Sequence, residues 1–205
     1  MEQLTDAQCD ALREMGNIGA AHAATVLSQM MNSNVEMSVP EIHLVDVSDL
    51  HSYIGDEVSA IVVFQITGDL GNGGFVVFQM PEPTARRMTA FVTGMQEGSP
   101  AFTDMDTSAI LEIGNIMVSA FLDGTAGLLN ILMLPSPPVF VMDMPHAAIE
   151  TIISAQALDI DSVVIFRTEL RSAEHEIHGN LLLLPNPLML RDILNLLEKL
   201  IAPHV

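Results

Sequence analysis

A carboxylate and an amide, three residues apart, occur twice in this chain, each time with a further polar residue one turn earlier. The first signature set is Asp10, Glu14 and Asn17, and the second is Ser108, Glu112 and Asn115. Spacings of i, i+4 and i+7 place each set on one stripe of a helix. An amide can accept a hydrogen bond from water and orient it, and a carboxylate can pair with a cation. A polar stripe alone usually marks only a solvent-exposed helix face.

Exact repetition favours a functional interpretation of the stripe. Glu14–Ile18 recurs as Glu112–Ile116 with only one difference, at an offset of 98 (112 − 14). Pro40 and Pro138 follow the two glutamates at the same distance of 26 (40 − 14 and 138 − 112). Repeats at a fixed period indicate a duplicated architecture. We therefore predict a single domain, residues 1–205, that is built from two homologous halves, about 1–100 and 101–205.

The offset between the halves grows along the chain. Pro81 and Pro185 are 104 residues apart, and each is followed six residues later by an arginine, Arg87 or Arg191. Six extra residues have therefore entered the second half. The polar segment 172–178 is the simplest place for them.

Two long helices are expected to carry the signature sets. The first should run from a capping box at Thr5 to about Met31, and the second from Asp106 or Thr107 to about Leu122. Gly16 and Gly19 lie inside the first helix, where each glycine costs about 1 kcal/mol relative to alanine. Close approach of another chain segment would offset that cost. The segment is either a neighbouring helix or a loop of a partner that reaches the amide.

The remaining elements are strands and shorter helices. Segments rich in Val, Ile and Phe and bounded by turn residues predict strands, and these are 35–39, 42–47, 58–67, 74–80, 139–142, 162–170 and 181–184. Asn72-Gly73 predicts a tight hairpin between two of them. Shorter helices are expected at 83–91, 145–155 and 188–200. This order predicts an α+β fold with a pseudo-two-fold axis, a central antiparallel sheet and paired signature helices.

Composition excludes several classes of protein. Only 7 Lys and Arg stand against 26 Asp and Glu, a net charge of −19, so no basic patch is available for nucleic acid. The longest apolar stretches contain prolines and fall short of the ~18 apolar residues of a membrane span. A single cysteine, Cys9, excludes an internal disulfide or a CxxC metal site. The N-terminus lacks the features of a signal peptide, so we expect a cytoplasmic protein without membrane insertion.

The duplicated pattern D/S-x3-E-x2-N-x22-P resembles the CheC, CheX and FliY family of chemotaxis phosphatases. Both halves fit the pattern without departure, and the resemblance covers essentially the whole chain. Within that family the CheC branch fits best. The 205 residues leave no room for the additional domain of FliY, and both halves keep the signature, unlike CheX.

The resemblance implies hydrolysis of the aspartyl phosphate of the response regulator CheY. Asn17 and Asn115 would orient the attacking water, and Glu14 and Glu112 would pair with a lysine of the regulator. Pro40 and Pro138 would shape the chain beside the helices, and the roles of Asp10 and Ser108 are the least defined. The family's metal is Mg²⁺ carried by CheY, so no metal or other cofactor is expected on this chain.

A binding function is the alternative. Proteins of the CheC type associate with CheD, a receptor-modifying partner, so the chain could act by sequestering CheD or phosphorylated CheY without catalysis. Intact Glu and Asn residues in both halves favour catalysis. Helix 145–155 lacks an obvious counterpart in the first half, which makes it a candidate contact for CheD.

Overall fold

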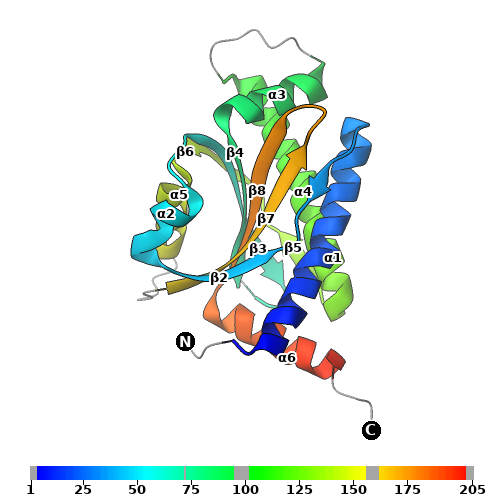
Figure 1. Ribbon diagram of the computed structural model, residues 1–205, viewed down its shortest axis with the longest axis vertical. Helices are drawn as coiled ribbons and strands as arrows, with labels where there is room; N and C mark the ends of the chain where they lie inside the picture. The colour runs from blue at the N-terminus through cyan, green and yellow to red at the C-terminus, as the bar shows by residue number, and fades with distance from the viewer. Residues whose placement is uncertain (1–3, 72, 95–101, 156–161, 202–205) are drawn as a thin grey trace.

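The structure, a computed structural model, describes residues 4–71, 73–94, 102–155 and 162–201 (Figure 1). The first half forms α1 (Asp6–Met31), β1 (Glu36–Met37), β2 (Glu41–Asp46), the 3-10 turn η1 (Val47–Asp49), α2 (Leu50–Ile54), β3 (Ser59–Gly68), β4 (Gly74–Pro81) and α3 (Glu82–Thr93). The second half forms α4 (Asp104–Leu129), β5 (Met133–Pro135), β6 (Val139–Asp143), α5 (Pro145–Ala155), β7 (Ser162–Ser172), β8 (Ile177–Pro185) and α6 (Pro187–Ile201). Apart from η1, the order of elements is therefore the same in both halves.

The strands form one curled antiparallel sheet with internal symmetry. Its order is β1-β7-β8-β4-β3-β5, and β2 also pairs with β7 while β6 pairs with β3. If each strand is exchanged for its counterpart in the other half, the order reads the same in reverse. The pseudo-two-fold axis therefore passes between β4 and β8. This arrangement confirms the predicted α+β fold with a central antiparallel sheet.

The two signature helices lie side by side and run in opposite directions (Figure 1). Each begins with a capping box, at Thr5 in α1 and at Thr103 in α4, that satisfies backbone N–H groups of the first turn. Each ends at an asparagine in the left-handed conformation, Asn32 or Asn130, which tolerates positive φ better than most residues. These caps are again 98 residues apart.

The bounds predicted for the second signature helix were wrong. Asp106 does not start the helix. It is the third residue of α4, and its side chain accepts the hydrogen bond that completes the capping box. At the other end, α4 continues seven residues past Leu122. Gly124 does not end the helix, because it is needed where α4 meets α1. A Cβ atom on Gly124 would lie 2.9 Å from the His22 ring and 3.2 Å from the Cα of Gly19.

The six extra residues of the second half also lie elsewhere than predicted. The turn between β7 and β8 spans four residues, 173–176, against the five of 69–73 between β3 and β4. In contrast, 18 residues separate β6 from β7 (144–161) and 12 separate β2 from β3 (47–58), a difference of six. The insertion therefore accompanies α5, which has 11 residues. The expectation that this helix lacks a counterpart was wrong, because the first half has the five-residue α2 at the same place in its order of elements. These two helices contact each other.

Other predictions need smaller corrections. Strand β1 is shorter than the expected 35–39, and β5 was not predicted. The helices expected at 83–91, 145–155 and 188–200 are present as α3, α5 and α6. The predicted turn residue Asn72 and the boundary between the halves at 100 and 101 lie outside the described residues.

Apolar layers cover both faces of the sheet. On one face α1, α3, α4 and α6 enclose a core around Phe64, Phe78 and Phe166, and on the other α2 and α5 cover a smaller cluster that includes Ile61 and Ile165. Helix α4 is long and apolar enough to cross a membrane by composition alone. Over half of its most apolar window is buried inside the fold, as expected for a core helix.

Candidate functional site

The first signature set lies on the outer face of α1. Asp10, Glu14 and Asn17 are all exposed, while Met15 and Gly16 between them are buried. The side chains of Glu14 and Asn17 have no hydrogen-bond partner within the described part of the chain. Asp10 differs, because its carboxylate accepts from Arg13 at 3.1 Å. The glutamate and the amide of this set are thus free to contact another molecule.

The second signature set lines a concave site on α4. Glu112 is exposed and Asn115 is half-buried, and neither side chain has a hydrogen-bond partner among the described residues. Both line a pocket whose opposite wall is the loop segment 135–138. Ser108 also lines it, but its hydroxyl donates to the backbone carbonyl of Asp104 at 2.9 Å. The half-buried amide of Asn115 therefore faces an open depression beside this loop segment.

The two signature prolines lie beside their helices. Pro40 is buried against Gly16, and its Cγ lies 2.7 Å from where a Cβ atom of that glycine would be. Pro138 is half-buried in the wall of the pocket that contains Asn115. At Gly16 the expected close approach is thus an internal contact with Pro40, and not the neighbouring helix or a partner's loop. At Gly19 it is the neighbouring helix, as predicted, because a Cβ atom there would meet Phe121 and Thr125 of α4.

The two sets face opposite ends of the helix pair. Gly19 of α1 packs against Phe121 and Thr125 of α4. Because the helices are antiparallel, this register separates Asn17 and Asn115 by about 15 Å along the helix axes, at ~1.5 Å of rise per residue. The sets therefore cannot combine into one site. They form two candidate sites related by the pseudo-two-fold axis.

The start of α4 is anchored to α3 through one carboxylate. Asp106 accepts from the backbone N–H and the hydroxyl of Thr103 at 2.9 and 2.6 Å, and from the hydroxyl of Thr89 at 2.5 Å. Burial acts to raise the pKa of Asp106, but these hydrogen bonds and the nearby Arg86 outweigh it and hold the pKa below its usual value. The anchor lies two residues before Ser108, so it fixes the end of the helix that carries the second set.

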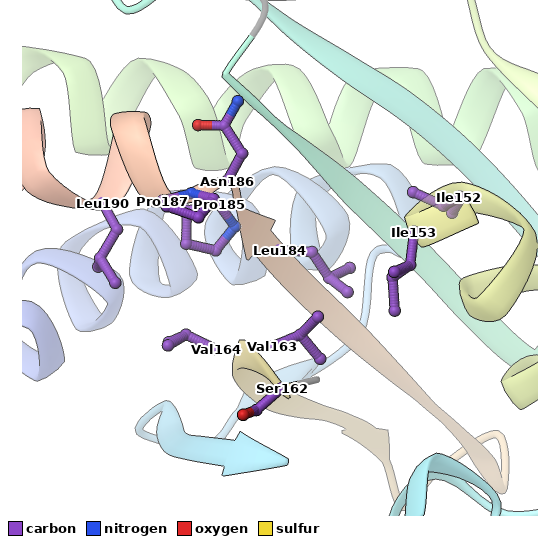
Figure 2. Close-up of a pocket in the computed structure, with 10 residues that line it drawn as sticks. All are labelled: Ile152, Ile153, Ser162, Val163, Val164, Leu184, Pro185, Asn186, Pro187 and Leu190. Carbon is purple, nitrogen blue, oxygen red and sulfur yellow. The ribbon is translucent and has the colours of Figure 1, made fainter. Parts of the chain in front are cut away.

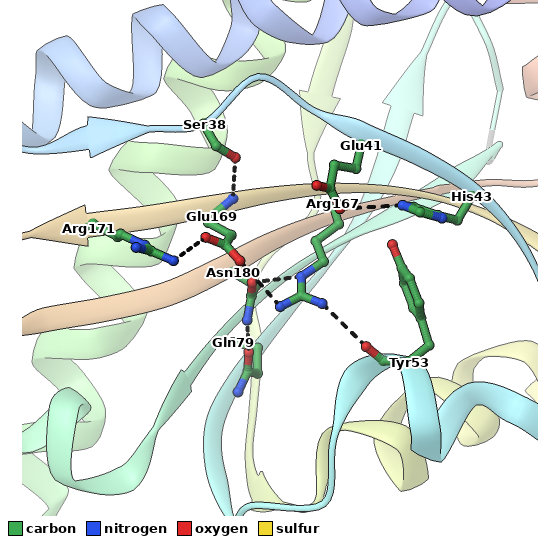
Figure 3. Close-up of polar contacts among 9 residues, drawn as sticks. All are labelled: Ser38, Glu41, His43, Tyr53, Gln79, Arg167, Glu169, Arg171 and Asn180. Carbon is green, nitrogen blue, oxygen red and sulfur yellow. Dashed lines mark hydrogen bonds and ion pairs between the residues drawn. The ribbon is translucent and has the colours of Figure 1, made fainter.

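A second polar cluster lies on the sheet face away from the signature helices (Figure 3). Arg167 donates to Asn180 at 3.0 Å and to the backbone carbonyl of Tyr53 at 3.3 Å. Asn180 donates to the buried Gln79, which donates to Ser59, both at 2.7 Å. This chain of bonds satisfies polar groups that would otherwise be costly to bury. We assign it to the stability of the sheet.

An apolar pocket lies between the ends of β7 and β8, α5 and α6 (Figure 2). Its lining includes no titratable side chain. The amide oxygen of Asn186, in this lining, accepts from the backbone N–H of Met189 and so caps α6. In the described part of the chain, no three His, Cys, Asp or Glu side chains gather as a metal site would require.

Comparisons with known proteins agree with the fold and the duplicated signature. The model of the CheC-like family matches residues 8–44 and 105–142, which contain both signature sets and both prolines. A relative named CheY-P phosphatase CheC, from Bacillus subtilis, is 28% identical over 194 residues, which cover 89% of this chain and 90% of the relative. The chain is therefore similar to the CheC-like family in both signature regions, and to the Bacillus subtilis protein along most of its length.

Solved structures share the fold at low identity. The crystal structure of Thermotoga maritima FliY has a TM-score of 0.74 at 18% identity, with 96% of this chain and 98% of that chain covered. A complex named CheX-CheY-BeF3-Mg+2, from Borrelia burgdorferi, has a TM-score of 0.55 at 16% identity and covers 83% of this chain and 96% of that chain.

Residues beyond the signature also shape the two sites. Leu111 and Ser136 line the second pocket, and the sequence patterns did not single them out. Ser136 has a counterpart in Ser38 at the same offset of 98, two residues before each signature proline. A residue-by-residue comparison of the two halves at the offset of 98 would have found this pair of serines.

Proposed function

We propose that this protein hydrolyses the aspartyl phosphate of a phosphorylated response regulator of the CheY type, at two sites on α1 and α4. The observation that carries the proposal is the repeated pair of accessible Glu and Asn side chains, which have no partner among the described residues. The family match and the names of the relatives support the same substrate. We expect the reaction to take place in the cytoplasm.

The proposed reaction needs little covalent chemistry from the protein. Water attacks phosphorus, the bond from phosphorus to the aspartyl oxygen breaks, and the aspartate leaves as a carboxylate with inorganic phosphate as the second product. An acyl phosphate is already activated, so positioning of the water and stabilisation of charge contribute most. The amide oxygen of Asn17 or Asn115 accepts a hydrogen bond from the water and aligns it with the phosphorus.

Glu14 and Glu112 serve in docking. Each is exposed and one turn before its asparagine, so a lysine of the regulator that pairs with the glutamate fixes the register of the helix. Mg²⁺ is expected on the regulator, where it neutralises the phosphoryl oxygens. We propose no metal or other cofactor for this chain.

The two sites need not contribute equally. Asn115 is half-buried in a pocket, whereas Asn17 is exposed on the surface of α1. A half-buried amide works in a less solvated setting, which strengthens its effect on a reacting water. We therefore propose that the second site provides most of the activity.

The deciding experiment measures the decay of phosphorylated CheY with and without this protein. Accelerated decay that is lost in the double variant Asn17→Ala, Asn115→Ala supports the proposal. Tight binding of the regulator without acceleration would support the alternative, a module that sequesters phosphorylated CheY. An association with CheD stays a prediction.

A further inference from the structure

In the first half, the chain contains one extra residue between two strands that pair with the same neighbour. Met37 of β1 pairs with Leu170 of β7, and Glu41 of β2 pairs with Arg167. Four steps along the first chain segment (41 − 37) thus correspond to three along β7 (170 − 167). One additional residue in an antiparallel pair is a β-bulge, which bends its strand and changes the direction of its side chains.

The same bulge is present in the second half. Pro135 of β5 pairs with Ile66 of β3, and Val139 of β6 pairs with Val63. Again four steps (139 − 135) correspond to three (66 − 63). The bulges fall at 38–40 and 136–138, and each ends in a signature proline. Bulges often occur next to functional sites, where they direct a side chain.

A serine side chain holds the first bulge to the sheet. The backbone N–H of Ser38 donates to the carbonyl of Glu169 at 2.9 Å. The return bond is unusual, because the N–H of Glu169 donates to the hydroxyl oxygen of Ser38 at 3.0 Å instead of to its carbonyl.

The second bulge has the same two bonds. The N–H of Ser136 donates to the carbonyl of Gln65 at 2.8 Å, and the N–H of Gln65 donates to the hydroxyl oxygen of Ser136 at 3.0 Å. The Ser136 hydroxyl itself donates to the carbonyl of Pro137 at 3.0 Å. The same arrangement occurs twice, 98 residues apart. It is therefore a regular part of the repeated unit and not a local irregularity.

The hydroxyl replaces a backbone carbonyl in the ladder. In a regular hydrogen-bonded pair, two residues exchange both bonds through their backbones. Here the serine side chain accepts one of them, so the serine's own carbonyl is free to turn away from the sheet. The chain can then bend without leaving the neighbour's N–H unpaired. The proline two residues later has no N–H and cannot take part in the ladder.

We infer that Ser38 and Ser136 are positioning residues for the two proposed phosphatase sites. Ser38 holds the bulge so that Pro40 packs against Gly16, beside Asn17. Ser136 fixes the loop that forms the wall of the pocket around Asn115. The inference rests on the proposed function, since it assigns these serines to the same reaction.

The test uses one site at a time. In an Asn17→Ala background, where only the second site is intact, Ser136→Ala and Ser136→Thr are compared for dephosphorylation of CheY over a range of CheY concentrations. We expect Ser136→Ala to lower kcat about tenfold, with KM within about twofold, because the wall moves while the docking glutamate is unchanged. Threonine keeps the hydroxyl and should retain most of kcat.

Controls separate positioning from general damage. Ser48→Ala removes an exposed serine that has no hydrogen-bond partner among the described residues, and it should leave kcat unchanged. Ser136→Cys nearly preserves the side-chain volume, but its sulfur is a much weaker hydrogen-bond acceptor than the serine oxygen. This variant replaces Ser136→Ala in the test if the alanine variant does not fold. In an Asn115→Ala background, Ser38→Ala should lower the residual rate in the same way.

An independent measurement covers the case in which the proposed function is wrong. Hydrogen exchange of the Gln65 amide should become about tenfold faster in Ser136→Ala, because that amide loses its acceptor. If the Asn17→Ala parent does not accelerate CheY dephosphorylation, the proposed function fails and exchange alone tests the serine. The inference is overturned if Gln65 exchange is unchanged, if kcat of Ser136→Ala equals that of the parent, or if threonine is as damaging as alanine.

Discussion

The ring of Pro40 fills the space that a side chain on Gly16 would need. Pro40 Cγ is 2.7 Å from the Cβ position of that glycine, and both residues are buried. In the second half the equivalent Gly114 faces Val62, Phe64 and Phe78 instead, at 3.4 to 3.5 Å, which is ordinary contact. The glycines of the two repeated motifs therefore have different room for a side chain.

The pair Gly16→Ala and Gly114→Ala should show this difference in stability. In Gly16→Ala the added methyl group collides with a proline ring that cannot rotate away, and such overpacking costs about 1–3 kcal/mol. In Gly114→Ala the methyl group fits, so the higher helix propensity of alanine stabilises by up to about 1 kcal/mol. Urea unfolding of both variants checks the prediction. Equal losses would contradict it.

The repeat made much of this architecture predictable. Because Glu14 and Glu112 lie in matched surroundings, the offset of 98 indicated two equivalent helices and two prolines beside them. A duplicated helix and strand order can form a single sheet about a pseudo-two-fold axis, and the structure has that arrangement. Sequence patterns were sufficient to predict these features, because residue identity and spacing alone specify the repeat.

Features that depend on tertiary contact could not be predicted in this way. Gly124 resembles a helix end in sequence, yet α4 continues because the glycine meets α1. Asn17 and Asn115 have the same local sequence, but Asn17 is exposed, whereas Asn115 is half-buried beside the segment 135–138. The bulges at Ser38 and Ser136 require the strand register, which the sequence patterns do not specify.

The anchor between α3 and α4 should make stability depend on pH. The pKa of Asp106 is lowered, so its carboxylate stabilises the fold above the unfolded-state pKa of about 3.9, and this contribution is lost as pH falls through the lower folded-state pKa. Thr89→Val removes one hydrogen bond to the carboxylate. We expect a loss of about 1 kcal/mol at pH 7, after allowance for solvent screening.

Urea midpoints at several pH values between 7 and 3 test this expectation. The difference in urea midpoint between Thr89→Val and the unchanged protein should become smaller below about pH 4, because Asp106 becomes protonated there. Thr151→Val is the matched control, because among the described residues the Thr151 hydroxyl donates only to a helix carbonyl, that of Ala147. Its effect should not vary with pH. A Thr89→Val effect that is constant across the range would rule out the carboxylate as its cause.

Loss of both docking glutamates should weaken association with the regulator. The double variant Glu14→Ala, Glu112→Ala is expected to bind phosphorylated CheY about tenfold more weakly, with a smaller dependence on salt, since it lacks a charge contact at each interface. The maximal rate at saturating CheY should change little. Titration of CheY at two salt concentrations measures both effects.

The control for that experiment has the same change in net charge. Glu57 and Glu150 are exposed carboxylates away from α1 and α4, so Glu57→Ala with Glu150→Ala also removes two negative charges. Its affinity for CheY should stay within about twofold of the unchanged protein. If the control weakens binding as strongly, the overall charge matters and specific docking by Glu14 and Glu112 is excluded.

Water positioning by the asparagines predicts a loss of rate without a loss of binding. Asn17→Ala combined with Asn115→Ala should lower the accelerated dephosphorylation of CheY by about 10²–10³, as is typical when a preorganised polar group is removed from a reacting centre. Each single variant keeps one complete site and should keep part of the activity. Asn115→Ala should have the larger effect, because Asn115 lies in a pocket and Asn17 is exposed. Rates and affinities measured on the same four proteins decide the matter: full phosphatase activity in the double variant refutes the mechanism, and equal single variants refute the proposed difference between the sites.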